Sequence, residues 1–208
     1  MTDKFLGWHF LREDGRTGYG GRKPVPGTLM HCKGPLELCA NGLHASARAI
    51  DALLYAPGPV VQRVELVGER LDEQDKSCAR SRRCLWIADA TRVLHELAIW
   101  CAEDALEKER RAGREPDRRS VEVLAVKRRW LDGQATNEEL SSARDAAWCA
   151  VQEARVATRE AVWVAAQDAA WSATRETALV AARAVARQSH DAELHARLMS
   201  LAPEGCVE

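Results

Sequence analysis

The spacing of apolar residues changes character near residue 88. Before that point they form short runs that are typical of strands. Residues 5–11 are aromatic-rich, and residues 60–67 are β-branched and partly alternate with polar residues. We expect further strands over residues 35–39, which end at an Asn-Gly turn signal, and over residues 84–87. The first part of the chain therefore predicts a small sheet.

A loop and one helix connect these predicted strands. Residues 14–27 are rich in glycine and proline, which predicts a loop. Ser46 is a residue type that caps helices, and Ile50, Leu53 and Leu54 follow it. We therefore expect a helix that begins at Ser46 and ends before Pro57.

After residue 88 the apolar spacing becomes helical. Asp89 can cap a first helix that runs to about residue 111, and residues 117–131 form a second one that Gly133 closes. Thr136 and Glu139 stand three residues apart, which is the spacing of a capping box. A third helical stretch is expected to begin there.

This last stretch, residues 134–202, contains neither glycine nor proline. As one helix it would extend on the order of 100 Å at about 1.5 Å per residue, which requires pairing with other helices or a reversal near residues 188–191. Alanine dominates it, and Ala-Ala-Trp occurs at residues 146–148 and 169–171. Alanine allows close helix approach and tryptophan supplies large apolar area, so we expect self-association through this tail.

Composition supports the same division. Ten of the thirteen glycines and five of the seven prolines lie at or before Gly68. Turn-forming residues are therefore confined to the part that carries the predicted strands. We predict an α+β protein, with a small mixed β-sheet head at residues 1–88 and an all-helical region at residues 89–208.

Charge and cysteine content narrow the class of protein. The 30 basic and 31 acidic side chains give a net charge of -1, which provides no general attraction to nucleic acid or to a membrane. No apolar run reaches the roughly 18 residues of a membrane span. The seven cysteines include no CxxC pair, and the N-terminus lacks the pattern of a signal peptide. These features predict a cytoplasmic protein with free thiols.

The Gly7-Trp8-His9-Phe10 segment is the first candidate for chemistry. In a strand, Trp8 and Phe10 lie on one face and His9 on the other. Two interpretations are open: two core aromatics with a hydrogen-bonded histidine, or a histidine that reaches a ligand.

The second candidate is the turn around Gly42. A turn followed by a helix start leaves backbone N–H groups that can bind an anion such as phosphate. His44 and Ser46 would lie at its mouth. The alternative is an Asn-Gly turn with Ser46 as an ordinary cap.

The third candidate is a basic run that follows Asp75-Lys76 and consists of Arg80, Arg82 and Arg83. This run could close over an anion, or it could form a solvated turn between strands.

Other chemistries find little support in the sequence. His31, Cys32, Cys39 and His44 do not have the spacing of a standard zinc site. The chain has no GxSxG elbow and no cysteine-protease signature. The arginines of the tail are balanced by acids, which favours ion pairs on a solvated face over nucleic-acid binding. We assign no metal, no cofactor and no catalytic residue.

The head resembles a family of uncharacterised proteins found in phages, prophages and actinobacteria. The resemblance covers about residues 6–88. Its motifs are Gly7-Trp8-His9-Phe10, Gly34-Pro35-Leu36-Glu37-Leu38-Cys39, Gly42-Leu43-His44-Ala45-Ser46, Tyr55-Ala56-Pro57-Gly58, Arg63-Val64-Glu65-Leu66 and Asp75-Lys76. Relatives often end, like this chain, in a helical tail rich in alanine, tryptophan and arginine.

This resemblance implies a phage or mobile-element setting and favours a ligand site in the head. The expected site residues are Trp8, His9, Lys33, His44, Ser46, Tyr55, Arg63 and Lys76. The order of the elements is also similar to that of ADP-ribosyltransferases, in which a histidine and a tyrosine hold NAD. That likeness would give those parts to His9 and Tyr55, with Glu65 or Glu69 as the catalytic glutamate.

Three functions follow as expectations. The first is a non-enzymatic binder of a small anionic, nucleotide-derived signal that acts in phage–host conflict. The second is an enzyme similar to ADP-ribosyltransferases that uses NAD. The third is a structural or protein-binding module that works through the helical tail, which would also form a homo-oligomer.

Overall fold

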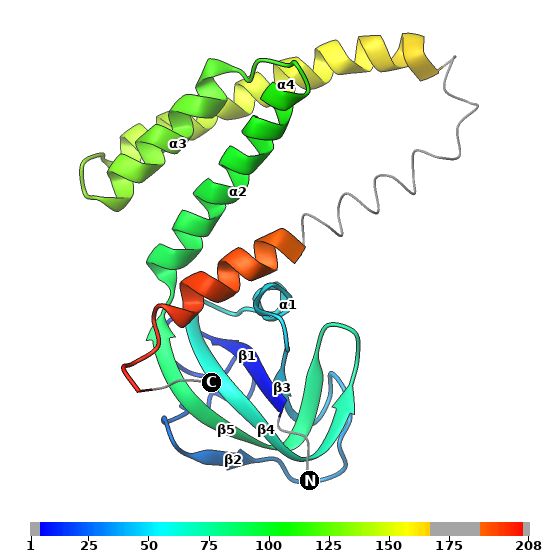
Figure 1. The fold of residues 1–208 in the computed structure, drawn as a ribbon, viewed down its shortest axis with the longest axis vertical. Coiled ribbons are helices and arrows are strands. Elements are labelled where there is room, and N and C mark those ends of the chain that lie inside the picture. The colour runs from blue at the N-terminus through cyan, green and yellow to red at the C-terminus, as the bar shows by residue number, and fades with distance from the viewer. Residues whose placement is uncertain (1–4, 167–187, 206–208) are drawn as a thin grey trace. The chain divides into compact units, whose positions relative to one another are not determined.

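The computed structural model describes residues 5–166 and 188–205 and confirms an α+β fold (Figure 1). It divides into two compact units. The first contains residues 1–94 together with residues 186–208, and the second contains residues 95–185. This division differs from the expected boundary at residue 88, because the last helical segment groups with the head.

The head is built on a five-stranded sheet. Strands β1 (Phe5–Leu11), β4 (Val60–Asp72), β5 (Ser77–Asp89) and β2 (Leu29–His31) lie in the order β1-β4-β5-β2, and β3 (Leu43–Ala45) also pairs with β5. Each of these pairings is antiparallel, a more uniform sheet than the mixed one expected. Val61 and Val64, from the β-branched run, lie in the central strand β4 and are fully buried.

The sheet closes on itself through one backbone bridge. Trp8 N–H donates to the Ser46 carbonyl at 2.8 Å, and Ser46 N–H donates to the Trp8 carbonyl at 3.0 Å. Because β3 pairs with β5 and the next residue pairs with β1, the path β1-β4-β5-β3 returns to its start. Two register shifts in β4 coil the β4–β5 ribbon, and Gly68 occupies the second with a φ of +88°.

Two expectations for strands are corrected. Residues 35–39 do not form a strand but part of a tight turn that Glu37 N–H and the Asn41 carbonyl close at 2.7 Å. The basic run Arg80–Arg83 is not a solvated turn but lies inside β5, which is much longer than the predicted 84–87 segment. Charged residues have low strand propensity, and pairing with strands on both sides outweighs it.

The short helix of the head begins later than expected. It is α1 (Ala49–Leu54), whose N-cap residue Arg48 makes no capping hydrogen bond with its side chain. Ser46 is not its cap because the N-cap position falls two residues later, at Arg48, and Ser46 instead belongs to the bridge with Trp8. The cap comes from Asp191, whose carboxylate accepts the Ile50 N–H at 3.0 Å. Asp191 belongs to a helix over residues 188–199.

The helical unit confirms the sequence signals at helix ends. Its elements are α2 (Thr91–Arg111), α3 (Arg118–Leu131) and α4 (Asn137–Ala166). Asp89 accepts the Thr91 N–H at 2.8 Å, Asp117 caps α3, and Thr136 and Glu139 form the predicted capping box. Whether residues 134–202 form one helix or a folded-back pair depends on residues outside the described ranges.

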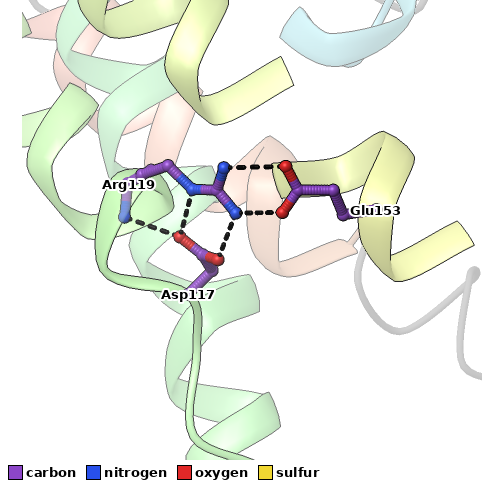
Figure 2. A network of polar contacts seen from close by, with 3 residues as sticks. All are labelled: Asp117, Arg119 and Glu153. Atoms are coloured by element: carbon purple, nitrogen blue, oxygen red, sulfur yellow. Dashed lines mark hydrogen bonds and ion pairs between the residues drawn. The ribbon is translucent and has the colours of Figure 1, made fainter. Parts of the chain in front are cut away.

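An arginine fastens the start of α3 to α4. Arg119 donates to the carboxylates of Asp117 at 2.9 Å and Glu153 at 3.1 Å, as Figure 2 shows. Exposed pairs of this kind contribute little individually, but this shared guanidinium fixes the register of two helices. Among the described residues, no helix is long and apolar enough to cross a membrane.

Closure of the sheet predicts a strict requirement for glycine at position 7. A Cβ at Gly7 would meet the Ala45 Cβ at 2.9 Å and the Ser46 carbonyl oxygen at 3.0 Å. We expect Gly7→Ala to lower the free energy of unfolding by roughly 1–3 kcal/mol in urea denaturation. The exposed Gly18, whose Cβ would approach only the Pro57 side chain at 3.4 Å, serves as the control. Equal stability of Gly7→Ala and wild type would show that the bridge is not tightly packed.

Candidate functional site

The expected site residues fall into separate groups in the head. Trp8 and Arg63 pack together inside, and His9 lies on the opposite face of β1. His44, Tyr55 and Lys76 lie near one another at the far end of the sheet. Ser46 is buried in the bridge that closes the sheet, and Lys33 is exposed, with its carbonyl accepting from Asn41 at 2.8 Å.

Trp8 is part of the core. It is fully buried and stands opposite Arg63 in the strand register, with the guanidinium carbon 4.6 Å from the centre of its ring. Trp86 and His195 make edge-on contacts with it at 5.7 Å and 5.4 Å. These neighbours occupy the positions that a stacked ligand would need. Trp8 and Arg63 are therefore core residues that pack beneath the candidate site and do not line it.

His9 is held neutral on the other face. The Gln62 amide nitrogen lies 2.9 Å from His9 Nδ1. An amide nitrogen only donates, so Nδ1 accepts and Nε2 carries the proton. Burial, followed by the positive charges of Arg82 and His44, lowers the pKa of His9 well below its ordinary value. Gln62 is fully buried, and its Oε1 has no hydrogen-bond partner in the described part of the chain.

Arg82 is the most unusual residue of the head. Only 2% of it is exposed, although it carries a charge. Its guanidinium donates to the His44 carbonyl, and the described residues include no carboxylate that pairs with it. Burial, with a smaller contribution from the nearby Arg22, lowers the pKa of Arg82 to about 10. Buried charges in proteins are normally paired, so this one lacks its usual counterpart.

His44 links Arg82 to the surface. Its Nε2 accepts the Cys39 N–H at 3.2 Å, which leaves the ring proton on Nδ1. Burial is the main cause that lowers the pKa of His44, and the charges of Arg82 and Lys76 add to it. His44 therefore lies close to both Arg82 and Lys76. His9 and His44 are each partly exposed. Two partly exposed imidazoles thus lie near enough to Arg82 for its charge to lower their pKa values.

Tyr55 and Lys76 form the outer end of this group. The Lys76 ammonium lies 5.1 Å from the centre of the Tyr55 ring, and Tyr55 O–H donates to Asp75 at 2.7 Å. Tyr55 is 53% exposed. Contacts with the Cys39 thiol and with Glu73 raise the pKa of Lys76, so it stays charged. An exposed aromatic ring thus lies beside a charged ammonium group.

Sequence reasoning did not select Gln62 and had only weak reason to select Arg82. Alternation in the Val60–Val67 run could have placed Gln62 on the His9 face, since the two residues are direct cross-strand partners. Arg82 gave a weaker signal, because it lies between Ser81 and Arg83 in a run that reads as solvated. Its burial depends on the closure of the sheet, which is not local information.

Metal and transferase chemistry receive no support from the described residues. They contain no group of three histidine, cysteine or acidic side chains placed to hold a metal. Both candidates for a catalytic glutamate are ion-paired, Glu65 with Arg83 at 3.6 Å and Glu69 with Arg80 at 2.9 Å. His9 and Tyr55 belong to different parts of the site, the first beside Gln62 and the second beside Asp75.

The helical unit also contains a groove of about 510 Å³ between α3 and α4. Its floor includes the buried Val126 and the small residues Ala143 and Ala146. Glu122, Arg129, Glu138 and Glu139 at its rim are exposed. The half-buried Arg119 is held by Asp117 and Glu153. This groove has no buried charge that would require a ligand.

Comparison with protein-family models, with curated proteins and with solved structures finds no match to this chain. The resemblance to the phage-associated family therefore stays a prediction.

Neutral His9 predicts a defined pH dependence of stability. Its pKa in the folded state lies below the ordinary 6.5, so the unfolded chain binds more protons as pH falls below about 6.5. Stability is thus complete above that pH and declines below it, by at most about 1.4 kcal/mol per pH unit for one proton. We expect His9→Gln to show a shallower decline than wild type in urea denaturation between about pH 5 and pH 7.5.

His44 and His95 also have lowered pKa values and remain in both proteins, so the difference between the two pH profiles isolates His9. Parallel profiles would mean that the pKa of His9 is the same in the folded and unfolded states, which would contradict the lowered pKa.

Proposed function

We propose that the head binds a small anionic ligand, a phosphate-bearing and nucleotide-derived molecule, without converting it. The observation that carries this proposal is Arg82, a buried cation whose only hydrogen-bond acceptor in the described chain is a backbone carbonyl. An anion in contact with Arg82 would supply the missing countercharge.

Electrostatics around Arg82 favours an anion over a neutral ligand. Arg22 and Lys76 add positive charge near it and near His44. The tautomer set by Gln62 leaves the Nε2–H of His9 as a donor, whereas the ring of His44 is engaged by the Cys39 N–H and by the Gly42 backbone. Charge-assisted hydrogen bonds to an anion are about twice as strong as neutral ones. Phosphate oxygens suit such a set of donors.

Tyr55 supports the nucleotide part of the proposal. Its exposed ring lies next to Lys76. Lys76 is in turn near His44, because its charge lowers the pKa of His44. The His44 carbonyl accepts a hydrogen bond from Arg82. A ligand with a phosphate at Arg82 could thus place an aromatic base on Tyr55. Base–aromatic stacking is worth about 1–3 kcal/mol per base in proteins that bind single strands.

Binding is favoured over catalysis by the state of the polar groups. Both imidazoles are held neutral by fixed hydrogen bonds, and Glu65 and Glu69 are ion-paired. These arrangements suit recognition of a ligand more than proton transfer. With the resemblance to phage-associated proteins, they suggest sequestration of a nucleotide-derived signal in phage–host conflict.

Arg82→Met tests this function. Without ligand, we expect the variant to be as stable as wild type or more stable, because the change removes a buried charge that lacks a counter-ion. The rise in Tm that phosphate, pyrophosphate or a nucleoside triphosphate gives wild type is expected to disappear. Ligand at about 100 times its Kd would stabilise wild type by about 2.7 kcal/mol. Thermal unfolding with and without each anion measures both effects.

Arg83→Met is the matched control, because Arg83 is the exposed neighbour in the same strand and should leave the Tm rise unchanged. The proposal fails if wild type responds to none of these anions and carries no small molecule after purification. It also fails if Arg82→Met is strongly destabilised and still responds.

A second candidate function, association through the helices, is favoured by Trp148. This tryptophan lies on the alanine-rich helix α4 and is 60% exposed. Large exposed aromatics are common anchors of protein interfaces. Self-association through this helix would make the protein a homo-oligomer.

Trp148→Ser should weaken such association at least tenfold, since truncation of an interface tryptophan typically costs about 2 kcal/mol or more. Sedimentation over a range of protein concentrations measures the change, and Trp148→Phe, which keeps an aromatic ring, should retain most of the association. A wild-type protein that is monomeric at all concentrations would rule out self-association.

A further inference from the structure

The helix over residues 188–199 is built into the head. Asp191, Leu194, His195 and Leu198 recur at the spacing of one helix face. Leu194 and Leu198 are fully buried, and His195 stands edge-on against Trp8. This face therefore contributes to the same core that supports the candidate site from behind.

Asp191 completes a helix to which it does not belong. Its carboxylate accepts the Ile50 N–H at 3.0 Å and the Arg48 Nε–H at 3.3 Å. The first N–H groups of a helix have no partner within it, and the side chain of the α1 N-cap residue does not supply one. The cap of α1 thus comes from a residue 141 positions further along the chain.

Helix α1 connects this cap to the site. It has six residues and ends at Tyr55, its C-cap residue, whose hydroxyl donates to Asp75. So short a helix makes few hydrogen bonds of its own and is marginal without external support. Loss of the cap at its start is therefore expected to loosen the whole helix, including Tyr55 at its end.

We propose that Asp191 is a positioning residue and that helix 188–199 is a conformational lock: docked on the head, it holds α1 and thereby Tyr55 in place for a ligand. Residues 95–185 lie between the two parts of the head in the sequence, so binding events on the helical unit could reach Tyr55 through this helix. Only the final effect on ligand binding rests on the function proposed above; the lock itself does not.

The test compares Asp191→Ala with Asp191→Asn in the full chain. Removing a capping acceptor costs about 0.5–2 kcal/mol, whereas asparagine caps as well as aspartate. We expect about tenfold faster hydrogen exchange at residues 50–55 in Asp191→Ala, unchanged exchange in β1 and β4, and rescue by Asp191→Asn. Glu193→Ala, which removes only the pair with Arg197 on the same helix, should leave α1 unchanged.

The pKa of Tyr55 is a second measurement, and a general loss of stability would not change it. The chain has two tyrosines, so a Tyr19→Phe background leaves Tyr55 as the only one. The hydrogen bond to Asp75 raises the pKa of Tyr55, and ultraviolet titration should find a lower pKa in Asp191→Ala. Leu198→Asp, which undocks the helix, should act in the same direction.

The lock is overturned if Asp191→Ala leaves both the exchange of α1 and the Tyr55 titration as in wild type. It is also overturned if exchange accelerates equally in β1 and β4, because Asp191 would then stabilise the head as a whole. If no anion binds wild-type protein but exchange at α1 still depends on Asp191, the proposed function fails and the lock remains.

Discussion

Closure of the small sheet through Trp8 and Ser46 is the constraint on which the head depends. Two backbone hydrogen bonds join β1 to the end of β3 and convert an open ribbon into a closed one. The approach is so close that only glycine fits at position 7. Arg82 pairs in β5 with Leu66 of β4 and with Met30 of β2, so it lies inside the sheet and not at an edge. The closed sheet buries it together with the carbonyl of His44.

Enclosure of a cation gives the head its chemical character. Overall charge gives no hint of this, because the chain is nearly neutral. Inside the head, however, the cost of removing Arg82 from water is offset by one described carbonyl contact and by no described carboxylate. Keeping His9 and His44 neutral limits repulsion between like charges. A bound anion would relieve the remaining cost, so stability and binding are coupled at this site.

Local signals in the sequence were sufficient for α2, α3 and the start of α4, and insufficient for α1 and for part of the sheet. Asp89, Asp117 and the Thr136–Glu139 pair cap the helices that follow them, because a cap depends on residues two or three positions apart. Alternation placed Trp8 and His9 on opposite faces for the same reason. Neither the long β5 strand nor the role of Ser46 has such a local cause.

The site was only partly predictable for a related reason. Tyr55 and Lys76 were both expected among the site residues, and the structure places the Lys76 ammonium 5.1 Å from the centre of the Tyr55 ring. Trp8 was expected to face a ligand. The strand register instead places Arg63 against its ring, and His195 makes an edge-on contact with it. The register and the return of helix 188–199 are properties of the folded chain, which spacing alone does not contain.

Chain topology explains why a distant aspartate should cap α1 at all. The helical unit is inserted between two parts of the head, residues 1–94 and 186–208. Its two covalent connections to the head are therefore α2 on one side and the segment leading to helix 188–199 on the other. The second connection ends in a helix fixed by two leucines, one aromatic contact and one cap. The cap acts directly on a neighbouring helix and is worth only about 0.5–2 kcal/mol, so it can transmit a change without unfolding the core.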